Sequence, residues 1–257
     1  MTQSWRFTEA EFYVLWRDRT EEELPEPFMF SSAAETTDEF ENELGDARKE
    51  LSRKLRGDFE AVFDAISKPD LYLTFYGWDE RDRWGTTSLK RLRATRKGAK
   101  GYLITQLPGE TYWIRGGYVV EECDPLRLSD AIVAAAPSAE RGVRGDIPLT
   151  SSDDDLDHDY GRSAIAARSE NAVTAGEAFL NAPMTAVGEI AVVQGSSVFG
   201  PRGIARHKLL FRDLEDDGRY VMVENPAQAL AVDQTRFVSV INRYVAAVIQ
   251  TIKDERA

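Results

Sequence analysis

The hydrophobic residues near the start of the chain recur every three to four positions, which is the period of an amphipathic helix. Thr8 and Glu11 have the spacing of a capping box, so we expect the first helix to begin there. Thr36 and Glu39 repeat this spacing and predict the start of a second helix. A third, shorter helix is expected over residues 59–66. The first quarter of the chain is therefore predicted to be helical.

The hydrophobic period then shortens to two, and aromatic and β-branched residues become frequent, as is typical of strands. Asp124 and Asp233 each follow such a region and are placed to cap a helix. A further helix is expected over residues 163–180, after a linker at residues 138–160 that is rich in Ser, Asp and Gly. The predicted strands are residues 71–77, 101–107, 111–115, 189–195, 207–213 and 219–224.

The order helix, strand, long loop, strand, hairpin, strand, helix thus occurs twice. Two predicted hairpin glycines, Gly109 and Gly218, are separated by the same number of residues as the two predicted caps. We therefore predict an internal duplication, with halves at about residues 1–137 and 161–257 of a single domain. The expected fold class is α+β, with a central antiparallel sheet shared by the two quasi-repeated halves and flanked by helical bundles.

Composition narrows the function. The formal net charge of −12 over 257 residues disfavours nucleic acid as a partner of the whole protein, because phosphate repels an acidic surface. The single cysteine, Cys123, excludes an internal disulfide and fits a reducing compartment. The N-terminus lacks the pattern of a secretory signal, and no apolar run approaches the length of a membrane span. A cytoplasmic protein without membrane insertion is expected.

One acidic segment nearly fits a calcium-binding EF-hand loop. In DLEDDGRYVMVE, residues 213–224, acidic side chains occupy the first, third, fifth and twelfth positions, and Gly218 occupies the sixth. An EF-hand needs a helix on both sides, whereas KLLFRD and RYVMVE alternate as strands. We therefore interpret the segment as a hairpin turn with Gly218 in a left-handed conformation.

Three other features are candidates for chemistry. Residues 153–159 carry five aspartates and His158, which is a metal-ligand set in composition but also typical of a solvated loop. Cys123 precedes a predicted helix start, a position that lowers the pKa of a thiol, and its alternative role is structural. His207 stands at the start of a strand. A small metal- or thiol-dependent enzyme that uses the acidic loop 153–159 or Cys123 is therefore the alternative function.

A basic segment stands out from the acidic background. Residues 90–100 carry six lysines and arginines, which suit RNA or an acidic protein surface. Lysines and arginines also protect the edge strands of sheets from unwanted pairing, and we interpret the segment as such an edge strand. The preceding residues, with Trp78 and Trp84, predict a long loop between strands, which is a common place for binding residues.

Two long segments resemble one protein family. WRFTEAEFYVLWRDRTEEELPEPF is similar to the opening helix of the EspG family of type VII (ESX) secretion-associated proteins. GPRGIARHKLLFRDLEDDGRYVMVENP resembles that family's arginine-rich approach, strand, Asp-Gly-Arg-Tyr turn and strand. The resemblance implies a cytosolic chaperone without a cofactor and without catalysis. Such a chaperone binds the hydrophobic helical tip of the PPE subunit in PE–PPE heterodimers, keeps it soluble and directs it to the secretion machinery.

The resemblance also implies where the partner binds. The family's binding surface combines the central sheet with C-terminal helices, and the matching positions here include the loop between residues 79 and 88. A weak homodimer is compatible with the resemblance, and neither nucleic acid nor membrane insertion is expected. The expected partner-binding residues are Leu210, Arg212, Met222, Tyr244 and Trp84, although each of the apolar ones also suits an ordinary core position.

Overall fold

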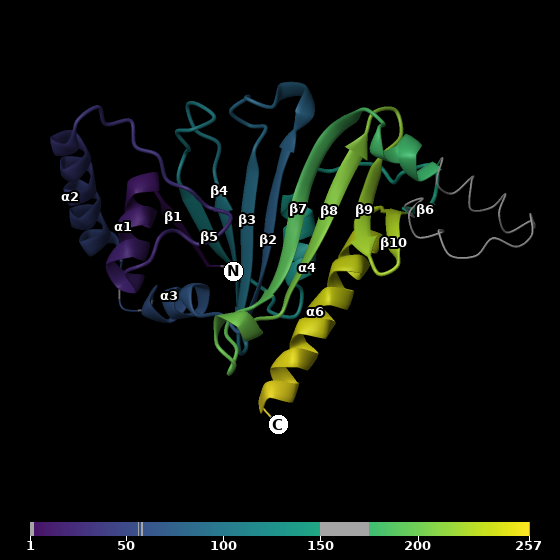
Figure 1. Cartoon of the computed structure of the whole chain (residues 1–257). Helices are drawn as coiled ribbons and strands as arrows, with labels where there is room; N and C mark the ends of the chain where they lie inside the picture. Colours follow the sequence, from purple (N-terminus) through teal and green to yellow (C-terminus); the bar gives the residue numbers. More distant parts are fainter. Residues whose placement is uncertain (1–2, 56, 58, 150–174, 257) are drawn as a thin grey trace, which may run out of the picture.

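Among the residues that the structure describes, ten strands form one antiparallel sheet (Figure 1). The computed structural model describes residues 3–55, 57, 59–149 and 175–256 of the chain. Each strand pairs antiparallel with its neighbours. Across the sheet the order is β1 (Ser4–Phe7), β5 (Tyr118–Cys123), β4 (Lys100–Gln106), β3 (Lys90–Lys97), β2 (Leu71–Asp79), β7 (Met184–Gln194), β8 (Arg206–Leu214), β9 (Arg219–Glu224), β10 (Ala227–Ala231) and β6 (Ile147–Pro148).

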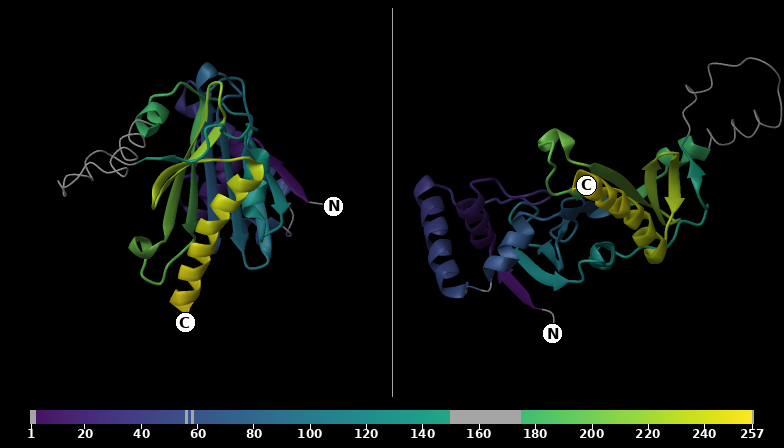
Figure 2. Two further views of the ribbon diagram at one scale, coloured as in Figure 1. Left: turned by 90° about the vertical axis from the view of Figure 1, so that its right-hand side faces the viewer. Right: turned by 90° about the horizontal axis from the view of Figure 1, so that it is seen from below.

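Helices cover the sheet unevenly. Helices α1 (Glu9–Thr20), α2 (Thr37–Lys54) and α3 (Phe59–Ser67) gather at one end, over the strands β1, β5 and β4 (Figures 1 and 2). Helices α4 (Leu128–Ala135) and α6 (Gln234–Arg256) pack on the strands in the middle of the sheet. Short helical turns lie at η1 (Glu80–Asp82) and η3 (Pro201–Gly203), and residues 175–180 are also helical.

The helical end is built on aromatic packing. The capping box predicted at Thr8 and Glu11 is present, with the Glu11 N–H donating to Thr8 Oγ1 and the Thr8 N–H donating to Glu11 Oε2. The same first turn places Phe12 against Tyr118 of β5, with ring centroids 4.2 Å apart. Offset aromatic pairs of this kind stabilise a core beyond the area that they bury. Helix α2 begins with the second predicted capping box.

The central strands divide their side chains between two faces. In β2, Leu71, Leu73 and Phe75 point into the core beneath α4 and α6, while the residues between them point to the opposite face. Gly77 of β2 pairs directly with Gly188 of β7. A Cβ atom at Gly188 would lie 2.4 Å from a ring carbon of Phe211, so the glycine pair leaves the space that this phenylalanine fills. The core under α6 depends on these two glycines.

Most of the predicted elements are confirmed. The three N-terminal helices, the five strands predicted at 71–77, 101–107, 189–195, 207–213 and 219–224, and the final helix capped by Asp233 are all present, the last with the Arg236 N–H 2.8 Å from Asp233 Oδ1. Strand order is the same on each side of the β2–β7 pair, with β3, β4 and β5 on one side and β8, β9 and β10 on the other. The duplication itself stays a prediction, as do its boundaries.

The strand predicted at residues 111–115 is wrong. These residues form an irregular loop, and the strand is β5, seven residues later. Arg115 stabilises this loop, because its guanidinium donates to the carbonyls of Thr86 and Leu89 and so ties the loop to the segment between β2 and β3. Gly109 therefore lies in the β4–β5 loop, and the hairpin turn between β3 and β4 contains Gly98 instead, at φ 56°. The predicted equivalence of Gly109 and Gly218 fails.

The predicted cap at Asp124 and part of the predicted linker are also wrong. The Asp124 carboxylate accepts the Leu126 N–H in a turn that precedes α4, and the helix begins at Leu128. Within the predicted linker, Ile147 and Pro148 form β6 and pair with β10. The helix predicted over 163–180 is confirmed for residues 175–180, and its earlier part lies outside the described residues, as does the remainder of the linker from residue 150.

The basic strand lies inside the sheet and not at its edge. β3 pairs with β2 on one side and β4 on the other, and Arg91 and Arg93 are each 5% exposed. Residues 24–31 cross over these arginines, with Arg93 donating to the carbonyl of Glu26 at 2.8 Å. Burial lowers the pKa of Arg93 to about 10. The prediction of a solvated edge failed because the Glu26 carbonyl, the Met29 sulfur and the Gln106 side chain accept hydrogen bonds from the two buried guanidinium groups.

Candidate partner-binding face

The sheet face opposite α4 and α6 carries two aligned rows of side chains, which we call the open face. In antiparallel strands, residues directly opposite each other share a face. Tyr76 of β2, Glu189 of β7, Leu210 of β8 and Met222 of β9 are opposite one another in turn. The next row contains Trp78, Val187 and Arg212. All seven residues are exposed or half-buried, whereas the other face of the same strands is buried core.

The open face is hollowed beside its apolar residues. A cavity of about 470 Å³ lies over β8 and β9, and Leu210, Met222, Leu149 and Ala227 are among its lining residues. Leu210 is 45% exposed, and its neighbour Met222 lines the same cavity, so that the apolar surface is shared by two strands. An ion pair between Lys208 and Glu189, 3.0 Å long, borders the apolar part. An apolar floor with a charged border is the anatomy of a protein–protein interface.

Two segments bound the open face. At the β9–β10 side, residues 175–180 bring Phe179 against Tyr220, with ring centroids 5.2 Å apart. Arg212 donates to the carbonyl of Leu180 at 2.8 Å and so ties this helical turn to β8. At the other side, residues 24–31 lie over β3, and Glu26 also pairs with Arg206 at 3.1 Å. Chain segments thus cover the sheet at both sides of the open face, and the rows on β2, β7, β8 and β9 between them stay accessible to solvent.

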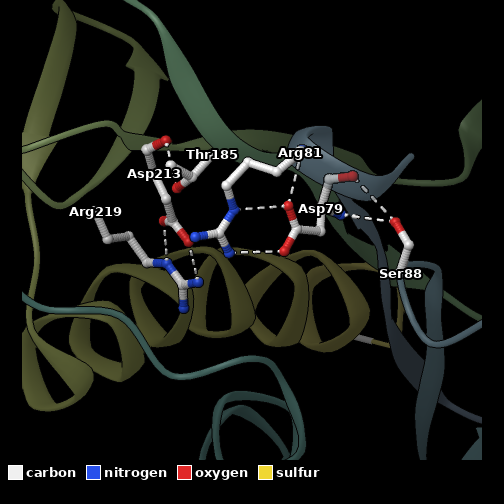
Figure 3. A network of polar contacts seen from close by, with 6 residues as sticks. All are labelled: Asp79, Arg81, Ser88, Thr185, Asp213 and Arg219. Atoms are coloured by element: carbon white, nitrogen blue, oxygen red, sulfur yellow. Dashed lines mark hydrogen bonds and ion pairs between the residues drawn. The ribbon is translucent and has the colours of Figure 1, made fainter. Parts of the chain in front are cut away.

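Polar residues fix the loops at one end of the sheet, where a second cavity of about 650 Å³ has Asp79, Arg81 and Asp213 among its lining residues. Arg81 makes hydrogen bonds of 3.0 and 2.7 Å to the two carboxylate oxygens of Asp79, and its guanidinium lies between the carboxylates of Asp79 and Asp213 (Figure 3). The Ser88 hydroxyl accepts the Asp79 N–H at 3.0 Å. Asp213 in turn pairs with Arg219. These contacts hold the β2–β3 loop beside the β8–β9 hairpin.

The EF-hand-like segment is a hairpin, as the alternation predicted. Strands β8 and β9 flank it, Asp213 is paired with Arg219, and Asp217 pairs with Arg144 and accepts the Tyr220 hydroxyl. The left-handed residue of the turn is Asp216, with φ 58°, and Gly218 has φ 153°. A side chain at Gly218 would meet the backbone of residues 140 and 141 at 2.7 Å. Gly218 is therefore outside the left-handed helical region that was predicted, and both its positive φ and its close packing account for the glycine.

Of the residues considered for catalysis, the structure describes Cys123 of β5 and His207 of β8, and four strands of the sheet lie between them. Burial, with help from Asp124 and Glu121, raises the pKa of the Cys123 thiol to about 11, which is opposite to the activation that a nucleophile needs. His207 packs against Tyr244, with ring centroids 5.2 Å apart. Among the residues described, no three His, Cys, Asp or Glu side chains are placed to hold a metal ion. The acidic loop 153–159 lies outside the described residues.

The structure separates the five predicted partner-binding residues. Leu210 and Met222 are direct neighbours on the open face, and Arg212 lies at its border. Trp84 lies in the β2–β3 loop and is 64% exposed. Tyr244 is on α6 and packs against the core on the other side of the sheet. Whether any of them binds a partner stays a prediction, and Tyr244 does not share a surface with the others.

The sequence reasoning missed the β2 and β7 part of the open face. Tyr76 and Val187 were not predicted, and the expectation that Trp78 lies in a loop is wrong, because Trp78 belongs to β2. In this strand Leu71, Leu73 and Phe75 alternate with Tyr72, Thr74 and Tyr76. That alternation indicates two faces of different chemistry. It does not indicate which face a helix covers, because the docking of α6 is a long-range contact.

The comparisons with known proteins agree with this architecture. A model of the EspG family matches residues 8–241, which is most of the chain. The chain belongs to the EspG family. A solved structure of the type VII secretion system chaperone EspG5 of Mycobacterium tuberculosis, in complex with the PE25–PPE41 dimer, superposes with a TM-score of 0.51. The two chains are 11% identical over 98% of this chain and 96% of EspG5, so this EspG-family protein and EspG5 share their fold.

No curated protein matches the sequence of this EspG-family member. Among the described helices, none combines the length and the apolar character that a membrane crossing requires.

Proposed function

We propose that this EspG-family protein is a cytosolic specificity chaperone of a type VII (ESX) secretion system that binds the hydrophobic tip of the PPE subunit of a PE–PPE heterodimer. The observation that carries the proposal is the family match across residues 8–241. The fold shared with EspG5, a chaperone whose structure contains a PE–PPE dimer, supports it. An exposed apolar tip is an aggregation hazard, and a chaperone that covers it until delivery keeps the substrate soluble.

The open face supplies a surface suited to this task. Leu210 and Met222 form an apolar strip on rigid central strands, beside a cavity and a charged border. A helical tip can place an apolar side chain over such a strip while its polar flanks meet Lys208 and Glu189. Because the strip is on paired strands and not on a loop, it is already formed before the partner arrives, which reduces the entropy lost on binding.

The test is co-expression with the PE–PPE heterodimers encoded in the same genome, followed by gel filtration with in-line light scattering. We expect one heterodimer to form a complex with one copy of each chain. Leu210→Asp and Met222→Asp should abolish this complex, because each places a charge in the apolar strip. Circular dichroism checks that the variants are folded.

The matched control is Val198→Asp. Val198 is 71% exposed, on the β7–β8 loop at the far end of the sheet, so its substitution tests the effect of a new surface charge alone. This variant should bind as the original protein does. Failure of every heterodimer to bind the unmodified protein would overturn the proposed function. Binding that survives both strand variants would place the partner elsewhere on the molecule.

A further inference from the structure

Three aromatic side chains from two loops form an exposed group beside the open face, which we call the aromatic cluster. Trp84 of the β2–β3 loop lies 5.0 Å from Tyr112 and 6.2 Å from Trp113 of the β4–β5 loop, measured between ring centroids. Trp84 is 64% exposed and Trp113 is 54% exposed. Such large apolar side chains, gathered and solvent-exposed, are the kind of surface that marks an interaction site.

The aromatic cluster is held in place by a buried arginine. Arg115 is 5% exposed, and its guanidinium donates to the carbonyl of Thr86 at 3.0 Å and to the carbonyl of Leu89 at 3.1 Å. It thereby ties the loop that carries Tyr112 and Trp113 to the loop that carries Trp84. Its burial lowers the pKa of the guanidinium. The two loops therefore present their aromatic rings in one arrangement, without help from a partner.

The aromatic cluster is continuous with the open face. Arg83 and Trp84 are neighbours in the β2–β3 loop, and Arg83 reaches a residue of the open face. Tyr76 contacts Trp78, with ring centroids 5.4 Å apart, and the Arg83 guanidinium lies over the Trp78 ring at 5.2 Å. Arg83 and Trp78 thus connect the aromatic cluster to Tyr76 of β2, which belongs to the same row of the open face as Leu210.

We propose that Trp84 and Trp113 are a second anchor for the same PE–PPE partner that occupies the open face, so that the partner is gripped at two points. This inference rests on the proposed function. Binding energy at interfaces is concentrated in a few residues, and tryptophan, tyrosine and arginine are the most frequent among them. The cluster provides tryptophan and tyrosine, and the buried Arg115 is a positioning residue that holds their two loops together. A rigid second anchor also fixes the direction in which the partner lies across the sheet.

The direct test is fluorine NMR of protein labelled with 5-fluorotryptophan. The chain has five tryptophans, so five resonances are expected, and Trp-to-Phe variants assign them. On addition of the PE–PPE heterodimer that forms a complex, the resonances of Trp84 and Trp113 should shift. The resonance of Trp16, which is 3% exposed in the helical end, should not.

A second measurement gives the affinity. The double variant Trp84→Ser/Trp113→Ser should weaken the complex by about tenfold or more, as expected for hot-spot side chains. The matched control is Phe199→Ser, which removes an aromatic side chain that is 76% exposed in the β7–β8 loop at the other end of the sheet, and it should leave the affinity unchanged. Arg115→Lys, which loses the forked contact to two carbonyls, should weaken binding less than the double variant.

The outcomes separate this inference from the proposed function. If the unmodified protein forms the complex but the two resonances stay in place and the double variant binds equally well, the second anchor is wrong and the proposed function stands. If the resonances of Trp84 and Trp113 shift with protein concentration in the absence of any partner, the aromatic cluster joins two copies of this chain instead, and the inference is overturned. If no heterodimer binds the unmodified protein, both fail.

Discussion

Arg219 and Asp213 form a buried ion pair in which two nitrogens of the guanidinium each lie 2.7 Å from a different carboxylate oxygen. The same guanidinium lies over the rings of Phe211 and Phe237, 5.0 and 5.6 Å from their centroids. Both residues of the pair are almost excluded from solvent, at 4% and 7% exposure. The pair therefore connects the base of the β8–β9 hairpin to the aromatic core under α6.

Removing one partner of this pair should be strongly destabilising. Asp213→Ala leaves the Arg219 guanidinium buried without a carboxylate, and we expect the free energy of unfolding to fall by about 3–5 kcal/mol. Arg219→Met should cost a similar amount, because the Asp213 carboxylate then loses its cation. Urea denaturation followed by circular dichroism measures both. The double variant Asp213→Leu/Arg219→Met should recover much of the loss, and a double variant as unstable as the sum of the two would contradict this account.

The hairpin should not respond to calcium. The first and fifth positions of its EF-hand-like segment, Asp213 and Asp217, already have cationic partners in Arg219 and Arg144. Calcium would have to displace these arginines and find helices that the hairpin does not have. We expect the melting temperature to be the same with calcium chloride in excess and with EDTA. A calcium-dependent rise in the melting temperature that Asp213→Ala abolishes would be the contrary result.

The ion pair at the start of α6 should make stability depend on pH in the acid range. The carboxylate of Asp146 accepts hydrogen bonds of 2.6 and 2.7 Å from Arg236 and one of 3.1 Å from the Ala231 N–H. The Arg236 contact first, and then the others, lower the pKa of Asp146 below its ordinary value of 3.8. A lowered pKa means that the stabilisation is complete above the unfolded-state value and is lost as the pH falls through the folded-state value.

Asp146→Asn should therefore cost about 1 kcal/mol at neutral pH, since both side chains of the pair are partly exposed. The difference in the free energy of unfolding between this variant and the original protein should become smaller as the pH falls below about 4, where an unperturbed aspartate becomes protonated. Urea titrations at several pH values measure it. Arg236→Gln is the matched variant and should show the same narrowing. If the difference in the free energy of unfolding stayed constant down to pH 2, the charge of Asp146 would not contribute to stability.

Local rules of the sequence account for the elements that begin with a side-chain cap. Thr8, Thr36 and Asp233 each predicted a helix start that the structure has, because the capping hydrogen bond is made within three residues. Asp124 caps a turn instead, at a corner where Gly101 of β4 packs against the backbone of Cys123 and Pro125. The rule fails where a neighbouring strand decides the backbone path.

Long-range contacts account for what the sequence did not predict. Arg91 contacts the Met29 sulfur at 2.6 Å and the Gln106 side chain at 3.1 Å, and neither partner is near it in the chain. The basic residues of β3 therefore predicted a solvated edge strand, although β3 lies inside the sheet and its Arg91 and Arg93 are buried. Similarly, Leu210 and Met222 were predicted as binding residues from their strands, but only the register of β8 and β9 shows that they are adjacent. Partner surfaces depend on such pairings, which single-sequence periodicity does not contain.

Cys123 should react slowly with alkylating reagents. Its pKa of about 11 leaves roughly three-hundredfold less thiolate at pH 7.5 than an ordinary cysteine with a pKa near 8.5 has. The rate of iodoacetamide labelling should therefore be low at neutral pH and rise through pH 10, with urea-unfolded protein as the fast control. Cys123→Ser should leave partner binding unchanged. Fast labelling at pH 7 in the folded protein would show that the Cys123 thiol is accessible and reactive. That result would support the alternative function of a thiol-dependent enzyme.

Binding of the PE–PPE partner should depend only weakly on salt. The proposed contacts are the apolar side chains of Leu210 and Met222 on the open face, and burial of apolar area is not screened by ions. RNA binding through residues 90–100 would instead weaken steeply with salt, in proportion to the phosphates neutralised. Two of the arginines that RNA binding would need, Arg91 and Arg93, are buried beneath residues 24–31.

The dissociation constant, measured by titration calorimetry at low and high sodium chloride, distinguishes apolar binding from charge-dependent binding. A nearly constant dissociation constant agrees with an apolar contact, and a steep loss of affinity with rising salt would show that charges, and not the strip on β8 and β9, hold the partner.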